Sequence, residues 1–221
     1  MKLFSKYTGI LIVLLFAWFL WQTFQDAARV KQTRERVSVP IQSQNGSNIK
    51  AELNTFEQIE GTDILRSGLY VTGDQESMAS YKSYQPIQNY IFFDATKKTF
   101  YFLKPNDQGL LLSTLNLTET FNNPMELKKI PPVAFAYLVA DQDTNNDKRI
   151  NQDDLKKIAI SDASGLRFKV LIDQVDKLNG TSIVKNNHVF LFYISANKLR
   201  AAEVDLRSQE IISTTEFKNQ P

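Results

Sequence analysis

The sequence of 221 residues contains no cysteine and only one histidine. The absence of cysteine excludes disulfide bonds, thiolate metal sites, cysteine catalysis and a lipidated N-terminal cysteine. A single histidine excludes a metal site built from several imidazoles. Glycine is also scarce, at eight residues, and no glycine-rich phosphate loop, G-x-S-x-G elbow or H-E-x-x-H motif is present. These absences remove most of the enzyme classes that a short motif identifies.

The single histidine, His188, does not point to catalysis. It follows the turn residues Asn186 and Asn187 and opens the apolar run H-V-F-L-F-Y-I, a position at which a histidine is usually a surface residue. Paired carboxylates of the glycosidase kind do not stand out either, because the acidic residues fall mostly in turn-like segments. We therefore expect a protein that is not an enzyme.

The net charge of +2 arises from an uneven distribution. Residues 1–36 carry six basic and two acidic side chains, whereas the remaining residues carry 20 and 22. A domain that binds nucleic acid concentrates Lys and Arg on its folded surface. Because the positive excess is confined to the N-terminal segment here, we expect no nucleic-acid partner.

A long apolar segment occupies residues 7–25. As a helix it would span about 28 Å, which is close to the thickness of a bilayer core. Trp18 and Trp21 suit the headgroup interface. A buried core helix is the alternative, but a helix that is apolar on every face needs protein on every side. A cleaved signal peptide would be cut after Ala28, where Asp26 replaces the small residue that cleavage requires, so the pattern favours an uncleaved signal anchor.

The segment divides the chain into four parts. We predict a short cytoplasmic tail at residues 1–6, a transmembrane helix at 7–25, a juxtamembrane helix and linker at 26–49, and an extracytoplasmic β-rich domain at 50–221. Counting basic residues slightly favours a cytoplasmic C-terminal side, but a short tail before one apolar segment is typical of export anchors. The prediction is therefore a single-pass inner (cytoplasmic) membrane protein with its domain in the periplasm or another extracytoplasmic space.

A hairpin repeat runs through the predicted β domain. Residues 90–103 (YIFFDATKKTFYFL), 158–171 (IAISDASGLRFKVL) and 201–214 (AAEVDLRSQEIIST) each read as strand, Asp, polar turn and strand. The three aspartates are Asp94, Asp162 and Asp205. An Asp that ends a strand is expected to accept hydrogen bonds from backbone N–H groups of the turn. Short helical turns are predicted only at residues 125–129 and 153–157.

This strand–Asp–turn–strand hairpin resembles the blade repeats of TolB-type periplasmic β-propellers. Asp162 and Asp205 are 43 residues apart, a spacing typical of propeller blades. Asp94 and Asp162 are 68 residues apart, which is 25 more than this spacing, and the interval between them includes an acidic segment. The resemblance implies a propeller-like or partial-propeller β domain that binds proteins. A β-sandwich made of similar hairpins is the alternative.

The acidic segment, residues 143–154 (DTNNDKRINQDD), resembles the calcium loop of dockerin repeats and EF-hands. The loop positions that supply oxygen ligands to calcium correspond to Asp143, Asn145, Asp147, Arg149 (through its carbonyl), Asn151 and Asp154. Two features depart from the pattern, because Lys148 stands where glycine makes the sharp turn and Asp154 replaces a bidentate Glu. We therefore expect a structural calcium site of weak, extracellular affinity, with a dissociation constant of about 10⁻⁴–10⁻³ M. The alternative is a polar turn whose Asx side chains cap their own backbone.

These features together predict a membrane-anchored accessory or scaffold subunit that binds other envelope proteins. Tethering to the membrane raises the local concentration of the domain, so modest affinities suffice. Two other functions stay open at this point. One is a ligand-binding or sensory module that acts alone, and the other is a calcium-supported envelope hydrolase.

Overall fold

The structure is a computed structural model that describes residues 39–40, 50–72, 87–106, 108–120 and 130–218. Within these residues the secondary structure consists of strands, and no helix is present. Accordingly, none of the described residues belongs to a helix that could cross a membrane. The predicted transmembrane helix at 7–25, the tail at 1–6, most of the linker and the helical turn at 125–129 lie outside the described residues.

The strands run from β1 to β15 in chain order. Their bounds are β1 Val39–Pro40, β2 Lys50–Leu53, β3 Glu57–Gln58, β4 Ile64–Thr72, β5 Ile87–Asp94, β6 Thr99–Phe102, β7 Leu110–Leu117, β8 Ala134–Ala140, β9 Arg149–Ile150, β10 Lys156–Asp162, β11 Lys169–Val175, β12 Lys177–Thr181, β13 His188–Ser195, β14 Lys198–Asp205 and β15 Glu210–Glu216. Every pairing between them is antiparallel. The mainly β prediction is thus confirmed for the described part of the chain.

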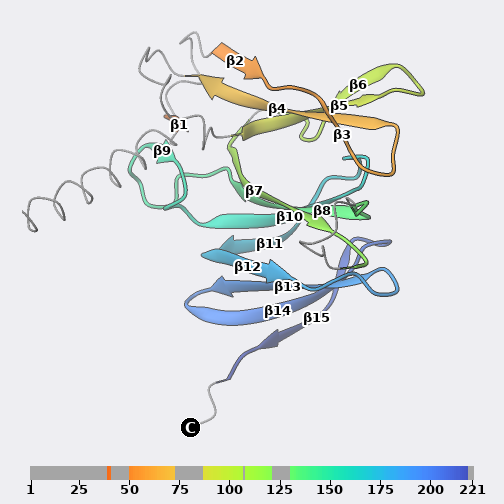
Figure 1. The fold of residues 1–221 in the computed structure, drawn as a ribbon. Coiled ribbons are helices and arrows are strands. Elements are labelled where there is room, and N and C mark those ends of the chain that lie inside the picture. The colour runs from red at the N-terminus through yellow and green to blue at the C-terminus, as the bar shows by residue number, and fades with distance from the viewer. Residues whose placement is uncertain (1–38, 41–49, 73–86, 107, 121–129, 219–221) are drawn as a thin grey trace, which may run out of the picture. The chain divides into compact units, whose positions relative to one another are not determined.

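The strands form three successive meanders (Figure 1). In meander I, β2 and β3 both pair with β4, which is followed by β5 and β6. Meander II contains β7, β8, β10 and β11, and meander III contains β12 to β15. Meanders I and II form one continuous sheet only through the pairing of Ile87 in β5 with Leu111 in β7. The two meanders separate beyond this point.

The predicted hairpin repeat corresponds to the last two strands of each meander. β5–β6, β10–β11 and β14–β15 are these hairpins, and Asp94, Asp162 and Asp205 are the final residues of β5, β10 and β14. Each carboxylate accepts hydrogen bonds from turn N–H groups: Asp94 from Thr96 and Lys97, Asp162 from Ser164 and Leu166, and Asp205 from Arg207 and Ser208. The predicted role of these aspartates is therefore confirmed.

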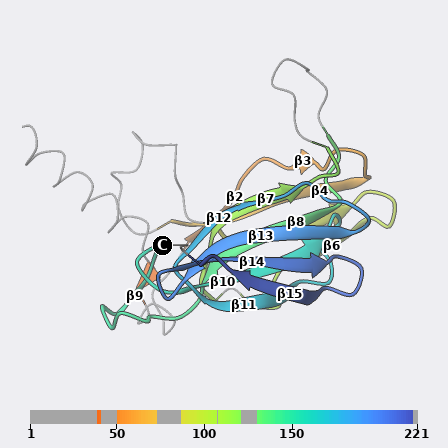
Figure 2. The same ribbon diagram turned by 90° about the horizontal axis from the view of Figure 1, so that it is seen from below.

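Meander II is covered on both faces. The alternation of small and large residues in β8 determines which neighbour each face meets, since successive side chains of a strand point to opposite sides. Ala134 and Ala136 belong to the core shared with meander III, whereas Phe135 and Tyr137 belong to the core shared with meander I. In Figure 2, strands of meander III are seen across strands of meander II.

The helical turn predicted at residues 153–157 is wrong. Strand β10 begins at Lys156 and pairs with β8 on one side and β11 on the other. The local sequence, with Asp at the start and Lys at the end, is compatible with a helical turn. Backbone pairing on both edges of β10 satisfies more hydrogen bonds than one helical turn would, so the tertiary context overrides the local preference.

Candidate functional site

The acidic loop, residues 141–155, connects β8 to β10 and includes the short strand β9. In meander III the corresponding connection between the second and third strands is only Ala196 and Asn197, flanked by the pair Ser195 and Lys198. The acidic loop is therefore an insertion relative to its counterpart. β9 pairs with β1, so that Val39 lies opposite Ile150 and Pro40 opposite Arg149. This backbone pairing connects the loop to the segment that precedes the domain.

The first half of the loop brings three predicted ligands together. Asp143 accepts hydrogen bonds from the backbone N–H of Asp147 at 3.2 Å and of Lys148 at 2.9 Å. The side-chain oxygen of Asn145 also accepts from the Asp147 N–H, at 3.0 Å. Asp147 in turn accepts from the N–H of Arg149 at 2.9 Å. The side-chain oxygens of these residues thus converge on one short stretch of backbone.

The second half of the loop is organised by Asp154, which is 1% exposed. Its Oδ1 accepts from the N–H of Thr144 at 2.7 Å, and its Oδ2 accepts from the N–H of Asn151 at 2.8 Å. The amide of Asn151 donates to the Asp147 carboxylate at 3.4 Å, which connects the two halves. The structure therefore places Asn151 with the first group, while Asp154 fixes the loop from its buried side.

The loop backbone adopts the sharp turn without glycine. Asn146 and Lys148 have φ angles of 60° and 64°, in the left-handed region that favours glycine. Lys148 occupies the position at which calcium loops carry glycine. The backbone conformation that this position requires is therefore present, although a lysine side chain has to adopt it.

The loop offers oxygen donors of the kind that calcium prefers, from Asp143, Asn145, Asp147 and Asn151. Among the described residues, no three Asp, Glu or His side chains lie close enough together to form a metal-binding group. The Asp154 carboxylate is engaged by the backbone N–H groups of Thr144 and Asn151 on the buried side. Each carboxylate oxygen in the first half still has lone pairs beyond its N–H bonds, so these groups fit a cation.

Two lysines fasten the C-terminal end of the loop. Lys156 is 8% exposed, and its ammonium donates to the carbonyl of Asp176 at 3.0 Å. Burial lowers the pKa of Lys156, while the neighbouring carboxylates of Asp153, Asp176 and Asp154 act in the opposite direction. Lys157 forms an ion pair with Asp141 at 3.0 Å, which joins the two ends of the loop.

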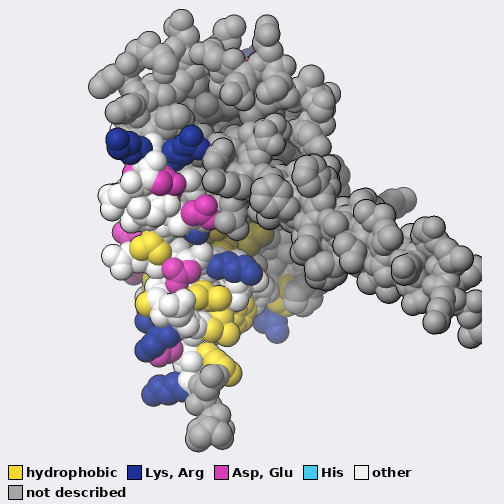
Figure 3. All heavy atoms as spheres, turned by 90° about the vertical axis from the view of Figure 1, so that its left-hand side faces the viewer, with side chains coloured by type: hydrophobic (Ala, Val, Ile, Leu, Met, Phe, Trp, Pro, Cys, Tyr) yellow, Lys and Arg dark blue, Asp and Glu magenta, His cyan; other side chains and the backbone are white. Residues whose placement is uncertain are grey.

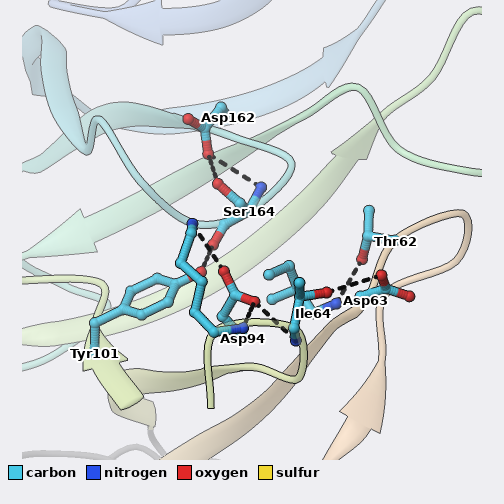
Figure 4. A network of polar contacts seen from close by, with 9 residues as sticks. Thr62, Asp63, Ile64, Asp94, Tyr101, Asp162 and Ser164 are labelled. Atoms are coloured by element: carbon cyan, nitrogen blue, oxygen red, sulfur yellow. Dashed lines mark hydrogen bonds and ion pairs between the residues drawn. The ribbon is translucent and has the colours of Figure 1, made fainter. Parts of the chain in front are cut away.

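A polar network joins the turns of meanders I and II (Figure 4). The hydroxyl of Tyr101 in β6 donates to the carbonyl of Ser164 at 2.7 Å, across the gap between the meanders. Burial raises the pKa of this hydroxyl. Within meander I, the Thr96 hydroxyl donates to the Asp63 carboxylate at 3.1 Å, which connects the β5–β6 turn to the start of β4. The network orders the turns that the hairpin repeat predicted.

The gap between meanders I and II also holds a cavity of about 250 Å³, which the sequence reasoning missed. Arg66 in β4 lines it together with Phe135 in β8. The guanidinium of Arg66 lies 4.7 Å from the centre of the Phe135 ring and 4.8 Å from that of Tyr90. The only sequence signal was a basic residue within the apolar strand I-L-R-S-G-L-Y. That signal does not reveal the surroundings of the side chain.

His188 lies on the outer face of meander III. Its Nδ1 is 3.0 Å from Oε1 of Glu203, and its side chain is 42% exposed. Ser213 donates to the other oxygen of Glu203 at 3.2 Å. The surface position predicted for this histidine is confirmed.

Large apolar side chains are exposed on the outer faces of the two end meanders. On meander I these include Phe100 and Phe102 of β6, which are 66% and 54% exposed. On meander III they include Phe190 and Phe192 of β13, which are 41% and 39% exposed. Phe56 packs edge-on against Phe100, and Phe93 also contacts it, with ring centres 6.1 and 4.6 Å apart.

Figure 3 shows the side of the domain that carries the acidic loop. Basic and acidic side chains are interspersed on this side, and hydrophobic side chains lie among them in its lower part. Lys198 and Arg200 both form ion pairs with Glu216, at 2.8 and 3.3 Å.

Comparisons with known proteins give a similarity in structure but none in sequence family. No family model matches the chain, and no curated protein matches it. Among solved structures, the chain is similar to the β-propeller domain of the Trilobed protease from Pyrococcus furiosus, which is reported to have an open velcro topology. The sequence identity is 10% and the TM-score 0.38, over 76% of this chain and 43% of that one. The chain thus spans less than half of that structure, and its own strand pairing defines the architecture described above.

Proposed function

We propose that the chain is a membrane-anchored extracytoplasmic accessory or scaffold subunit that binds other envelope proteins. The observation that carries this proposal is the exposure of Phe100 and Phe102 on β6. Contiguous exposed aromatic side chains are uncommon on proteins that act alone and are enriched in protein–protein interfaces. The apolar segment at residues 7–25 supports the anchor.

Strand β6 has two further properties of a docking surface. Within the described residues it pairs only with β5, so no described strand occupies its outer edge, and such an edge can accept a strand of a partner. Phe56 and Phe93 contact Phe100 and extend the apolar face onto β5 and the connection between β2 and β3. A partner protein would cover both the edge and the face, and the aromatic rings would supply the central contacts.

The proposal also includes a propeller-like architecture of the TolB type. Support comes from three antiparallel meanders that follow one another in the chain, each ending in the same Asp-capped hairpin. The two end meanders expose apolar outer faces, as expected of a partial propeller in which no further blade covers them. Partner proteins would use these faces.

The test is purification of the full-length protein from its native membrane in mild detergent, with mass spectrometry of the accompanying proteins. The double variant Phe100→Ser/Phe102→Ser is compared with Phe190→Ser/Phe192→Ser, which changes the same residue types on meander III. We expect a stoichiometric membrane partner that is lost in the first variant and retained in the second.

Two outcomes would contradict the docking of an envelope partner on β6. One is a partner retained equally by both variants. The other is a difference in oligomeric state, measured by light scattering. If the unmodified chain is an oligomer and the Phe100→Ser/Phe102→Ser variant is a monomer, the occupant of the surface is a second copy of the chain.

The second part of the proposal is a structural calcium ion in the acidic loop, held by oxygens of Asp143, Asn145, Asp147, Arg149, Asn151 and Asp154. The convergence of the Asp143, Asn145 and Asp147 oxygens and the left-handed backbone at Lys148 support it. When bound, calcium would neutralise the acidic side chains and stiffen the insertion against β1.

The full chain should melt at a lower temperature in chelator than in millimolar calcium, and Asp143→Ala/Asp147→Ala should abolish the difference. Lys148→Gly should enlarge it, because glycine adopts a φ of 64° without strain and removes a positive charge. Lys148→Gln removes only the charge and separates the two effects. Identical melts of the unmodified chain with calcium and with chelator would rule out the ion.

A further inference from the structure

The cavity between meanders I and II exists because the two meanders share one backbone pair and then diverge. Ile87 and Leu111 form this pair. Beyond it, the inner face of β4–β5 and the inner face of β7–β8 are separated by side chains instead of backbone hydrogen bonds. The resulting cavity of about 250 Å³ is lined by Arg66, Phe135, Asn116, Ile59, Glu57 and Glu60, among others. A volume of this size admits a small organic molecule or the end of a peptide.

The guanidinium of Arg66 is the unusual group in this cavity. It lies against the faces of Tyr90 and Phe135, at 4.8 and 4.7 Å from the ring centres. Its Nη1 is buried and has no hydrogen-bond partner among the residues that the structure describes. Buried donors are almost always paired, because an unpaired one loses its bonds to water without replacement. Because Arg66 lines the cavity, an acceptor that enters it would meet a guanidinium that is short of hydrogen-bond partners.

The two nearby carboxylates do not fill this role. Glu57 lies directly opposite Arg66 in the β3–β4 pairing, yet no ion pair joins them, and both Glu57 and Glu60 are exposed at the rim. The faces of Tyr90 and Phe135 hold the guanidinium in place. In contact with two rings, it is oriented before any ligand arrives, which reduces the entropy lost on binding.

We propose that this cavity binds the carboxylate of a ligand that has a single negative charge and an apolar body. A carboxylate accepts two parallel hydrogen bonds from a guanidinium, and such charge-assisted bonds are the strongest that this group makes. Ile59 and Phe135 supply apolar walls for the body of the ligand. The carboxylate belongs either to a small organic acid or to the C-terminus of a peptide.

The rim restricts which ligands enter. Glu57 and Glu60 would repel a second negative charge at the outer end of the ligand and would favour a neutral or cationic group there. A dicarboxylate or a phosphate should therefore bind more weakly than a monocarboxylate of the same size. The side-chain amide of Asn116 adds a neutral polar group to the lining.

This site is separate from the docking surface proposed above. Arg66 and Tyr90 face meander II, whereas Phe93 and Phe100 lie on the outer face of meander I. The binding proposed here goes beyond the scaffold function and does not depend on it. The Phe100→Ser/Phe102→Ser variant should therefore bind the ligand unchanged, so that the two proposals fail independently.

The test is calorimetric titration of the full-length chain in lipid nanodiscs with N-acetyl-leucine and with N-acetyl-leucinamide. The two probes share the apolar body and differ only in the carboxylate. We expect the acid to bind at least about tenfold more tightly than the amide, as one charge-assisted hydrogen-bond pair implies. This comparison uses the unmodified chain and needs no variant to fold.

Two variants then assign the effect to the site. Arg66→Gln should abolish the preference for the acid, whereas Arg207→Gln, which removes an exposed arginine away from the cavity, should leave it unchanged. Exchanging both Glu57 and Glu60 for Gln should improve binding of N-acetyl-glutamate while leaving N-acetyl-leucine unaffected.

The length of the probe that binds best distinguishes a peptide C-terminus from a small organic acid as the source of the carboxylate. If the tripeptide N-acetyl-Ala-Ala-Leu binds more tightly than N-acetyl-leucine, the natural ligand is a peptide C-terminus. If it binds more weakly, the ligand is a small acid. Equal binding of acid and amide, absence of binding by all probes at millimolar concentration, or a preference that persists in Arg66→Gln would each overturn the proposal.

Discussion

The two faces of meander II meet different kinds of core. The core shared with meander III is aliphatic and built from side chains such as Ile158, Ile160 and Leu191. The core shared with meander I is aromatic and contains Phe92 and Tyr137. The aromatic side also holds the hydrogen bond from Tyr101 to Ser164 and the Arg66 cavity.

The difference shows how one strand separates a densely packed interface from one that holds a cavity. Aliphatic side chains pack densely and leave little space, so the interface of meanders II and III contributes mainly to stability. Aromatic rings are larger and rigid, and they leave room beside them for polar groups. The aromatic interface is therefore the one that accommodates a cavity. Four predictions test this separation, from the largest expected effect to the smallest.

Truncation in the aliphatic core should have the largest effect. Leu191 is completely buried, and Leu191→Ala should lower the free energy of unfolding by about 2–5 kcal/mol, because it removes buried methyl groups and leaves a void. Phe190→Ala, on the exposed side of the same strand, should cost about 1 kcal/mol or less. Urea unfolding of the full chain measures both, and equal losses would contradict the assignment of the two faces.

A methyl group added at the aromatic interface should have the next largest effect. Gly165, in the Asp162 turn, has a φ of 78°, and a Cβ there would collide with the ring of Phe92. Gly165→Ala should cost about 1–3 kcal/mol and change the near-ultraviolet circular dichroism of the aromatic cluster. Leu191→Ala should leave that signal unchanged.

Gly180→Ala is the control for the collision. Gly180 also has a positive φ, of 147°, but a Cβ there would meet no atom within 4 Å. If Gly180→Ala costs as much as Gly165→Ala, backbone strain rather than contact between meanders explains the loss.

Removal of one polar bond at the aromatic interface should cost less. The hydroxyl of Tyr137 lies 2.9 Å from that of Ser161, and burial raises its pKa. Tyr137→Phe should lower stability by about 1 kcal/mol, the net value of a buried hydrogen bond. Tyr193→Phe is the matched change in the aliphatic core, where the hydroxyl makes no hydrogen bond with any described residue. It should be close to neutral by urea unfolding, and a larger loss there than at Tyr137 would contradict the comparison.

The smallest effect on stability should come from lowering the pH. Backbone N–H groups, of Lys97 above all, lower the pKa of Asp94, and that of Arg207 lowers the pKa of Asp205, from an ordinary value of 3.8. A carboxyl group with a lowered pKa stabilises the fold above its unfolded value, and this contribution is lost as the pH falls through the folded value.

The urea concentration at which half of the protein is unfolded should therefore decrease once the pH is lowered below about 4. Asp94→Asn and Asp205→Asn should each flatten this dependence, because an amide does not titrate. Since one aspartate belongs to meander I and the other to meander III, the pair reports whether the two ends of the domain respond alike. An unchanged acid response in both variants would show that other groups cause it.

Local patterns predicted much of the β domain. The repeat around Asp94, Asp162 and Asp205 located three hairpins and the hydrogen bonds that cap their turns, because an Asp at a strand end acts on residues close to it in the sequence. The helical turn at 153–157 failed for the opposite reason, since the pairing of β10 with β8 joins strands separated by the 15-residue acidic loop, residues 141–155, and is not a local contact.

The residues of the acidic loop also fall into those that local spacing places and those that tertiary contacts place. Asp143, Asn145 and Asp147 come together within one loop, as their spacing indicates. The direction of the Asp154 carboxylate, toward Thr144 and Asn151, depends on how the loop sits against the domain. The calcium ion itself, the anchor and the envelope partner stay predictions.

The sequence by itself determined the antiparallel β class, the capped hairpins and the order of residues in the acidic loop, because each depends on alternation or on groups a few residues apart. Only the tertiary structure decided which faces of the meanders meet, that Phe100 and Phe102 are exposed, and that Arg66 lies against Tyr90 and Phe135 beside a cavity. These properties depend on contacts between strands distant in the chain, where packing rather than local preference sets the surroundings of each side chain.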